Sequence, residues 1–443
     1  MLGVLSDRTY RRLFLAQVIA LVGTGLATVA LGLLSYDIAG GNAGAVLGGA
    51  LAIKMIAYIG VGPVVNAFVD RLPRRAFLVA MDLVRAAVAI FLPFVTEVWQ
   101  VYALIFLLQS ASAAFTPTFQ AAIPDILPDE KAYTRALSLS RLAYDLESLV
   151  SPTLAAALLG VMSFHWLFGG TVIGFLASAM LVVSVVVPQP KPAPREGGIY
   201  ARTTRGTRIY LKTPRLRGLL ALNLTAAAAG AMVIVNTVVY VRSVLGRSAD
   251  DVALGLAAFG GGSMVAALLL PRVLDRLDDR RLMIAAAGVL GLCLFGMAAL
   301  TRLPAAEQWI ALLAVWGVMG MGYSAVLTPS GRLLRRSAHP EDRSALFAAQ
   351  FALSHACWLI TYLVAGMAGA RFGMTVTLVA LGGLAILGVV VASRVWPRAD
   401  AERLPHHHPE LAASHPHLRG TSSPHTHEFV IDDLHQEWPQ VKP

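Results

Sequence analysis

Two stretches decide the fold of this chain: DRLPRR at residues 70–75 and DRLDDRR at residues 275–281. The second stretch repeats the first 205 residues later. Two shorter patterns recur 212 residues apart, namely Thr-Pro at 116–117 and 328–329, and Pro followed by two acids at 128–130 and 340–342. A parallel duplication is typical of transporters in which the substrate cavity lies between two halves near the membrane midplane.

The composition is that of a chain that lies mostly in lipid. Of its 443 residues, 56% are hydrophobic and only 14% are charged, whereas about a quarter are charged in a soluble domain. A helix needs about 20 mainly apolar residues to cross a bilayer. The sequence predicts an all-α membrane protein with twelve transmembrane helices in two six-helix pseudo-repeats. They are expected at 13–36, 44–69, 77–94, 98–122, 137–160, 166–187, 217–241, 251–270, 282–301, 308–331, 345–369 and 373–396.

The positions of Lys and Arg predict the orientation. They concentrate in the two tails and in every second loop, which the positive-inside rule assigns to the cytoplasm. Both termini are therefore expected on the cytoplasmic side. The net charge of +10 follows from this distribution, since these residues face anionic lipid. The lipid bilayer is thus the expected partner, and nucleic-acid binding is not needed to explain the charge.

The chain divides into four predicted parts. Residues 1–187 form the N-terminal half, 188–216 a cytoplasmic linker rich in Pro and basic residues, 217–396 the C-terminal half, and 397–443 a cytoplasmic tail. Alternate prolines predict an extended spacer at the start of the linker, followed by a solvated basic stretch. The tail has many prolines and acids and few apolar residues, which predicts disorder.

Two six-helix halves, each with an Asp-Arg…Arg-Arg loop after its second helix, resemble the major facilitator superfamily over about residues 8–396. The family's loop has glycines where this chain has Asn66 and Pro73, so its turn differs while its charges remain. The Ser151-Pro152-Thr153 segment is similar to a motif of the superfamily's antiporters, and residues 115–125 and 206–217 resemble its enterobactin and macrolide exporters. The resemblance implies export by rocking halves. It also implies gating loops at Asp70, Arg71, Arg74, Arg75, Asp275, Arg276, Arg280 and Arg281.

Ionisable groups inside predicted helices are candidates for transport and coupling, because charge is costly in lipid. They are Glu147, Asp145, Arg141, His355, Asp82 and Arg85. Helical spacing puts Arg141 and Asp145 on one face as a predicted salt bridge, and Glu147 on the opposite face. Glu147, with no cation nearby in sequence, is the predicted proton or cation carboxylate.

Each of these candidates also has a structural alternative. Both acids could pair with Lys54 or Arg85 and only hold the bundle together. Asp82 and Arg85, three residues apart, most simply pair with each other. His355 could take a proton or a metal ion, or could form a hydrogen bond across a helix interface.

The C-terminal tail carries eight of the 11 histidines. They are His406, His407, His408, His415, His417, His425, His427 and His435. Imidazoles with carboxylates and no thiol suit Ni, Co, Zn or Cu(II) and do not suit Cu(I). The alternatives are an expression tag, a solvated tail and a pH-sensing segment; the dispersed histidines argue against a tag.

A twelve-helix chain with such a tail resembles the bacterial nickel-resistance exporters. This implies a multi-pass protein of the bacterial inner membrane that exports a divalent transition metal, nickel first, by proton antiport. Two alternatives stay open: a proton-coupled exporter of a drug-like or siderophore compound, and a membrane metal sensor that does not transport. No phosphate-binding Gly-Lys-Ser/Thr loop occurs, so we expect no ATPase and no enzyme. We expect a monomer whose metal ion is substrate and which has no resident cofactor.

Overall fold

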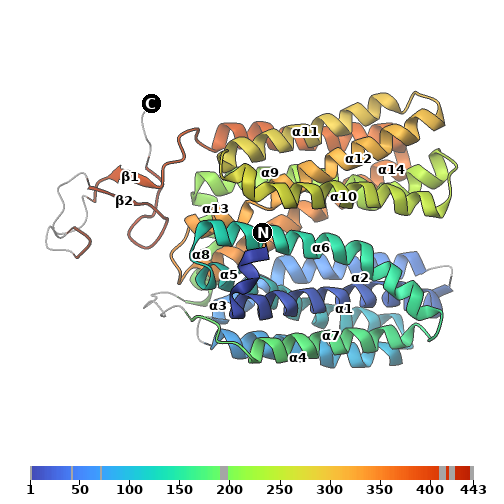
Figure 1. The fold of residues 1–443 in the computed structure, drawn as a ribbon, viewed down its shortest axis with the longest axis horizontal. Coiled ribbons are helices and arrows are strands. Elements are labelled where there is room, and N and C mark those ends of the chain that lie inside the picture. The colour runs from blue at the N-terminus through green and yellow to red at the C-terminus, as the bar shows by residue number, and fades with distance from the viewer. Residues whose placement is uncertain are drawn as a thin grey trace.

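The computed structural model describes residues 2–40, 43–69, 72–189, 198–408, 416–418 and 425–439. Its long helices run along one common axis and form two bundles that lie side by side, one containing α1–α7 and the other α9–α14 (Figure 1). Both chain ends lie at the same end of the bundles, where the tail projects (Figure 1). We call the bundles the first and second halves.

The helices follow the order that the duplication predicts. The first half contains α1 (Arg8–Ala39), α2 (Ala43–Ile56), a π-helical turn (Ala57–Val61), α3 (Gly62–Val69), α4 (Arg74–Phe91), α5 (Val98–Ile126), α6 (Glu130–Leu159) and α7 (His165–Val183). The second half contains α9 (Pro214–Val239), a π-helical turn (Tyr240–Val244), α10 (Ala249–Leu274), α11 (Asp279–Leu300), α12 (Ala305–Leu327), α13 (Ser330–Arg336) and α14 (Arg343–Val395).

The remaining elements lie at the end that bears the tail. They are α8 (Ile199–Lys212), which connects the halves, and strands β1 (Arg403–His406) and β2 (His425–Glu428). Short 3-10 turns occur at Leu2–Ser6, Leu92–Phe94 and Pro416–Leu418.

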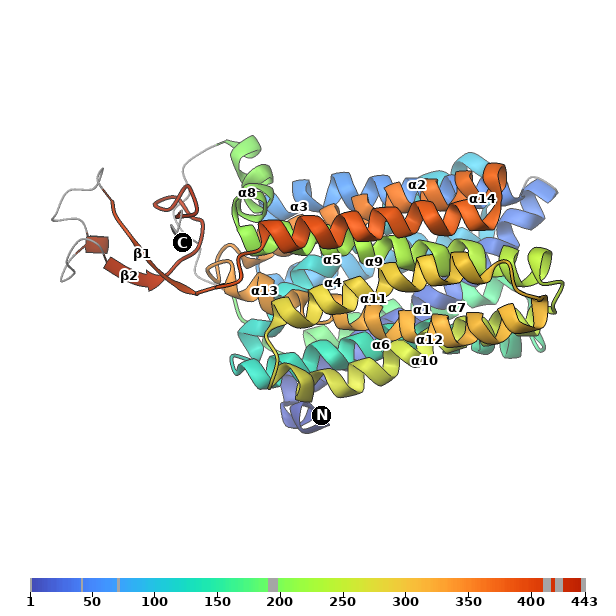
Figure 2. The same cartoon turned by 90° about the horizontal axis from the view of Figure 1, so that it is seen from above.

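The predicted twelve spans are confirmed. Within the described ranges, 11 helices are long and apolar enough to cross a membrane. One of them, α14, has 53 residues and is interrupted at Gly373, where φ is 78°. Glycine adopts this backbone conformation without the steric cost that a Cβ brings. The chain reverses there, so α14 supplies two spans, and its red part runs back along the bundle (Figure 2).

Small residues allow the helices to approach closely. At the contact of α10 with α12, a Cβ on Gly262 would lie 1.9 Å from the carbonyl oxygen of Gly317, and one on Gly320 would lie 1.9 Å from that of Phe259. Close backbone approach is the usual source of packing energy between helices in lipid, where apolar surface alone gives no preference for protein over lipid.

The linker differs from the prediction that its basic stretch, after the proline spacer, is solvated. Residues 199–212 form α8, whose Gly206, Ile209 and Tyr210 are buried. Their spacing of three and four residues makes one apolar helix face, and Arg208 between them is exposed. The prediction is therefore wrong for α8, because an apolar stripe was present among the basic residues. The predicted spacer at 190–197 lies outside the described residues.

The tail also departs from the predicted disorder over 397–443. Strand β1 pairs antiparallel with β2, with Arg403 opposite Glu428 and His406 opposite His425. Leu404, Phe429 and Ile431 are buried against the second half. The prediction is wrong for these described parts of the tail. Its few apolar residues cannot form a core of their own, but they can pack on a surface that the bundle already provides.

The glycine contact gives a test of the packing. Replacing Gly262 with Ala should lower stability by about 1–3 kcal/mol, because the new methyl group would overlap the α12 backbone. Thermal unfolding of the purified protein in detergent measures this effect. Gly261→Ala is the matched control, since a Cβ there meets nothing within 4 Å. Equal melting temperatures for both variants would contradict the close contact of α10 with α12 at Gly262.

Candidate functional site

Ion pairs close the end of the molecule that carries the tail. Asp125 at the end of α5 pairs with Arg74 of the first half at 2.6 Å and also with Arg343 of the second half. Arg74 further donates to the hydroxyl of Ser344 at 3.1 Å. Because Asp125 is shared between arginines of both halves, these bonds must break before the halves can separate here.

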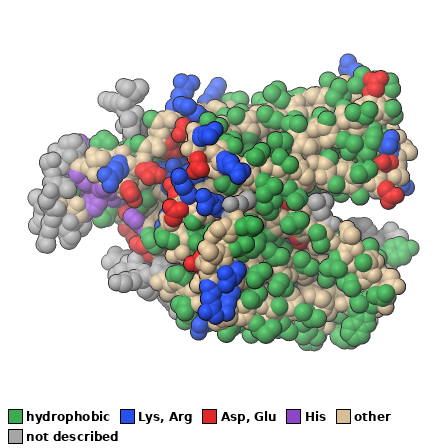
Figure 3. Space-filling model, in the orientation of Figure 1, with side chains coloured by type: hydrophobic (Ala, Val, Ile, Leu, Met, Phe, Trp, Pro, Cys, Tyr) green, Lys and Arg blue, Asp and Glu red, His purple; other side chains and the backbone are tan. Residues whose placement is uncertain are grey.

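A second group of charges joins the halves beside the first. Arg332 of α13 pairs with Glu130 of α6 at 2.6 Å and donates to the Thr134 hydroxyl at 2.9 Å. Arg332 and Arg336 each also lie 3.1 Å from Asp279 of α11. Charged side chains gather at this end in Figure 3, whereas a cleft separates the two halves at the opposite end. By the positive-inside rule the closed end is cytoplasmic, so the molecule is open to the outside.

The predicted gating residues have different environments. Arg74 lies in the closed gate, and Asp275 lies 4.0 Å from Lys131 of the other half. Arg280 donates to the carbonyl oxygen of Trp396 at 3.0 Å and so holds the end of α14 within its own half. The side chains of Arg75, Arg276 and Arg281 are exposed. Asp70 and Arg71 lie outside the described residues.

Sequence reasoning missed most of the gate. The principal missed residues are Asp125, Glu130, Asp279, Arg332, Arg336 and Arg343. Two signals were available: the repeated acidic pattern at 128–130 and 340–342, and the basic cluster at 332–336. Neither signal tells which acid meets which arginine, because the partners come from segments far apart in the chain.

Polar residues meet between the halves deeper in the bundle. Arg141 and Asp145 of α6 form the predicted salt bridge, with Nε of Arg141 3.3 Å from Asp145. The hydroxyl of Ser263 on α10 donates to Asp145 at 2.6 Å and accepts from Arg141 at 3.2 Å. The Arg141 guanidinium also lies over the Tyr323 ring, 4.8 Å from its centroid. This pair therefore links the two halves and is already well satisfied.

Glu147 differs from Asp145, as its helical face predicts. It is half-buried and faces Gly25 of α1. A Cβ added at Gly25 would lie 2.7 Å from a carboxylate oxygen of Glu147. Lys54 of α2 is close enough to interact with it electrostatically. No cation lies near Glu147 in sequence, and Lys54 comes from another helix, as the structural alternative allowed.

His355 faces the first half across the interface. Its Nδ1 must donate to the carbonyl oxygen of Phe351, 2.7 Å away, which leaves Nε2 as the atom able to accept a proton or a metal ion. Its ring packs edge-on against Tyr58 of the first half, with centroids 4.7 Å apart. The ammonium nitrogen of Lys54 lies over the Tyr58 ring, 5.5 Å from the ring centroid.

Asp82 and Arg85 pair with each other inside the first half. Asp82 is fully buried and accepts a hydrogen bond of 2.8 Å from Ser178. Arg85 is held between the rings of Phe115 and Phe175, at 4.1 and 4.5 Å from their centroids. These contacts agree with the simple pairing expected from their spacing.

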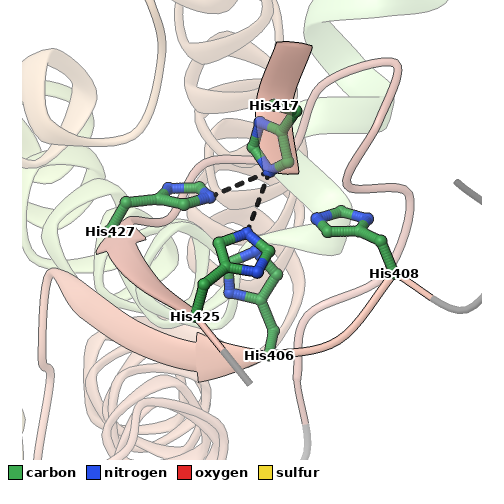
Figure 4. Close-up of side chains that lie close together, drawn as sticks. All are labelled: His406, His408, His417, His425 and His427. Atoms are coloured by element: carbon green, nitrogen blue, oxygen red, sulfur yellow. Dashed lines mark hydrogen bonds between the residues drawn. The ribbon is translucent and has the colours of Figure 1, made fainter. Parts of the chain in front are cut away.

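The tail brings histidines from three segments to one point. His406, His408, His417, His425 and His427 each offer a ring nitrogen, and these five atoms lie within 4.8 Å of one another. Figure 4 shows the rings converging from β1, β2 and the 3-10 turn. We call these five residues the histidine cluster. His408 Nε2 and His425 Nδ1 are buried without a hydrogen-bond partner among the described residues.

A sixth histidine is fixed beside the cluster. His435 Nε2 lies 3.1 Å from His406 Nε2, while His435 Nδ1 donates to Asp432 at 2.9 Å. A carboxylate that holds one ring nitrogen and turns the other toward a site is the usual outer support of a metal-binding histidine. The other oxygen of Asp432 lies 3.4 Å from His339, in the loop between α13 and α14. His407 is outside the cluster, and His415 lies outside the described residues.

The surroundings keep the cluster in the form that binds metal. Desolvation, followed by repulsion from neighbouring imidazoles, lowers the pKa values of His406, His408 and His425, and lowers that of His417 to about 4. These rings are therefore neutral at pH 7, and only neutral imidazole has a lone pair for a metal ion.

Comparisons with known proteins place the chain in a family. The model of the Major Facilitator Superfamily matches in two overlapping parts, residues 13–303 and 219–417. The chain is 27% identical over 153 residues to macrolide efflux protein A of Enterococcus faecalis and of Streptococcus pyogenes, which is 32% of this chain. The match spans only 47% and 38% of those relatives. An uncharacterized MFS-type transporter of Bacillus subtilis, YvqJ, is 24% identical over 89% of this chain and 94% of its own length.

Solved structures share the fold at low identity. A bacterial homologue of the iron transporter ferroportin, in an outward-facing state, has a TM-score of 0.71 at 15% identity and covers 88% of this chain and 98% of its own. The proton:xylose symporter XylE has a TM-score of 0.70 at 14% identity and covers 88% and 96%. The fold, the duplicated halves and the family match agree: the chain belongs to the Major Facilitator Superfamily and is a multi-pass membrane transporter, not an enzyme.

Proposed function

We propose that this transporter exports a divalent transition metal ion, nickel first, from the cytoplasm of a bacterium in exchange for protons. The observation that carries the proposal is the histidine cluster, with five imidazole nitrogens within 4.8 Å. Four nitrogens around an ion at about 2.0–2.1 Å from it would stand roughly 3.3 Å apart. A small contraction of the cluster therefore suffices for coordination.

The donor set indicates the class of ion. Imidazole suits Ni, Co, Zn and Cu(II), whereas Cu(I) prefers thiolate and thioether ligands. The two cysteines, Cys293 and Cys357, lie in α11 and α14 and are not part of the cluster. The choice of nickel within this class rests on the resemblance of the whole chain, with its tail, to nickel-resistance exporters.

The location of the cluster suits loading of cargo from the cytoplasm. Attached to the end where the gate closes, it would raise the local concentration of metal ion at the entry, as any tethered binding site does. Inside the bundle, Glu147 and His355 both lie near Lys54 and would exchange metal for protons, since both must be deprotonated to bind. The metal is cargo here, and no resident cofactor is proposed.

The comparisons support export without naming the cargo. The macrolide relatives are efflux proteins by name, and the fold of the ferroportin homologue occurs in an iron transporter family. These relatives are bacterial, which supports a place in the bacterial inner membrane. The proposal treats the protein as a monomer, since the two halves of one chain enclose the interface.

An organic substrate is the second candidate. It is favoured by the macrolide relatives and by aromatic rings at the interface of the halves, among them Tyr58, Phe351 and Tyr323. In that case the tail would serve only as an accessory. The two candidates differ in whether loss of the cluster changes tolerance to metal or tolerance to macrolide.

The cluster can be tested by replacing His406, His417 and His425 together with Asn. Purified full-length protein should then lose its tight binding of Ni(II) in calorimetry, because only two of the five ligands remain. In a metal-sensitive bacterial strain the variant should give weaker nickel tolerance than wild type without abolishing it, since the bundle site is intact.

His165→Asn is the matched control, because His165 lies at the opposite end of the bundle and stacks on Phe164. It should bind nickel as wild type does. A triple variant with wild-type nickel affinity would show that the cluster is not the nickel site. Wild-type protein that gives cells tolerance to macrolide and none to nickel would rule out the metal proposal.

Coupling is tested by Glu147→Gln, which keeps the shape of the side chain and removes its charge. Nickel-driven proton movement in membrane vesicles, followed by a pH-sensitive dye, should fall about tenfold or more if this carboxylate carries the exchange. Glu307→Gln, at an exposed position of α12, is the control. If Glu147→Gln moves protons at the wild-type rate, Glu147 is not the coupling carboxylate and Asp145 becomes the candidate.

A further inference from the structure

The tail is fastened to α8 as well as to the second half. Asp433 pairs with Arg205 at 2.9 Å and with Arg208 at 3.7 Å. Lys212, at the end of the same helix, donates to the backbone carbonyl of Gln436 at 2.8 Å. The tail segment just beyond the histidine cluster therefore binds three successive basic residues along one helix.

The position of α8 makes this contact sensitive to the state of the gate. The helix contacts α3 of the first half and α14 of the second half. Gly206 sits so close to α14 that a Cβ would lie 2.0 Å from the Ala345 carbonyl oxygen. Arg205, held by Asp433 on one side, pairs with Asp342 at 2.6 Å on the other. In this state, with its cytoplasmic end closed, α8 therefore touches both halves.

A second chain of contacts connects the histidine cluster to the cytoplasmic gate. His435 touches His406 of the cluster through its Nε2 and Asp432 through its Nδ1. Asp432 in turn contacts His339 in the loop that leads into α14. Four residues later, Arg343 makes the ion pair with Asp125 that joins the halves.

We propose that the tail is a metal-responsive latch: metal ion bound at the histidine cluster holds the tail against α8 and the 337–342 loop, and so favours the closed cytoplasmic gate. This inference rests on the proposed function for the metal class, and it adds regulation to it. Metal draws the rings of β1, β2 and the turn together, which orders the segment that carries Asp432 and Asp433. A ligand shifts an equilibrium toward the state it binds better, and in this closed state the tail is docked on α8.

The latch has a defined place in an export cycle. Closure of the cytoplasmic gate after a metal ion has entered prevents its return, so a metal-loaded tail favours the forward step. A tail that only stores metal would leave the gate equilibrium unchanged. The two roles therefore differ in the response of the gate to metal, and not in metal binding.

The experiment measures the gate directly in full-length protein in lipid nanodiscs. Spin labels are attached at Leu72→Cys and Leu277→Cys, exposed loop positions of the first and second halves, after Cys293 and Cys357 are replaced by Ala. The Asp125→Asn background removes an inter-half ion pair and should populate the open gate. The distance distribution between labels is recorded with and without Ni(II), and with Mg(II) as a control ion.

Ni(II) should reduce the open population about fivefold or more, within the usual range of coupling between two sites. Asp433→Asn should abolish this response while calorimetry still shows Ni(II) bound, with the affinity lowered by no more than the same factor, because coupling is reciprocal and Asp433 binds α8 and not the cluster. Asp250→Asn, an exposed acid at the outer end of α10, is the matched control and should keep the response.

Two results would overturn the latch and leave the proposed metal binding standing: Ni(II) bound with no change in the distances, or an equal gate response in Asp433→Asn and wild type. Absence of Ni(II) binding to the wild-type protein would instead overturn the proposed function, and the latch with it.

Discussion

The sharing of Asp125 between Arg74 and Arg343 is the interaction on which the observed state depends. One carboxylate satisfies an arginine from each half, and both arginines are largely shielded from water. Breaking such a shared contact without replacement leaves charge unpaired in a partly dry site, which is costly. The halves therefore stay closed at the cytoplasmic end, and the cleft opens at the other end (Figure 3). The ion pairs of Asp125 must be replaced by contacts with water whenever the transporter opens to the cytoplasm.

The tail adds a second layer to that closed end. Its acids neutralise basic residues of α8 and of the gate region, as when Glu402 approaches Arg336 at 3.4 Å and Asp433 approaches Arg205 at 2.9 Å. Its few apolar residues pack on the second half. The histidine cluster is thus part of the folded molecule at the entry of the transport path. Under the proposed function, this placement would connect metal binding to alternating access.

Much of this could be predicted from sequence, and the failures share one cause. The spans, the duplication and the Arg141–Asp145 pair follow from local spacing, because hydrophobic length and helical periodicity are properties of short segments. Lys54 beside Glu147, Arg343 on Asp125 and Ser263 on Asp145 join helices far apart in the chain, so no local pattern reveals them. The order of the tail was missed for a related reason: its stability comes from a surface supplied by other residues.

Nickel flux itself tests whether a metal ion is the cargo. Everted membrane vesicles containing the full-length protein would be energised with an acidic interior, and entry of radiolabelled Ni(II) would be followed over time. The account predicts accumulation against the nickel gradient that collapses when a proton uncoupler is added. Proton-dependent accumulation of a macrolide in the same vesicles, with no entry of nickel, would contradict it.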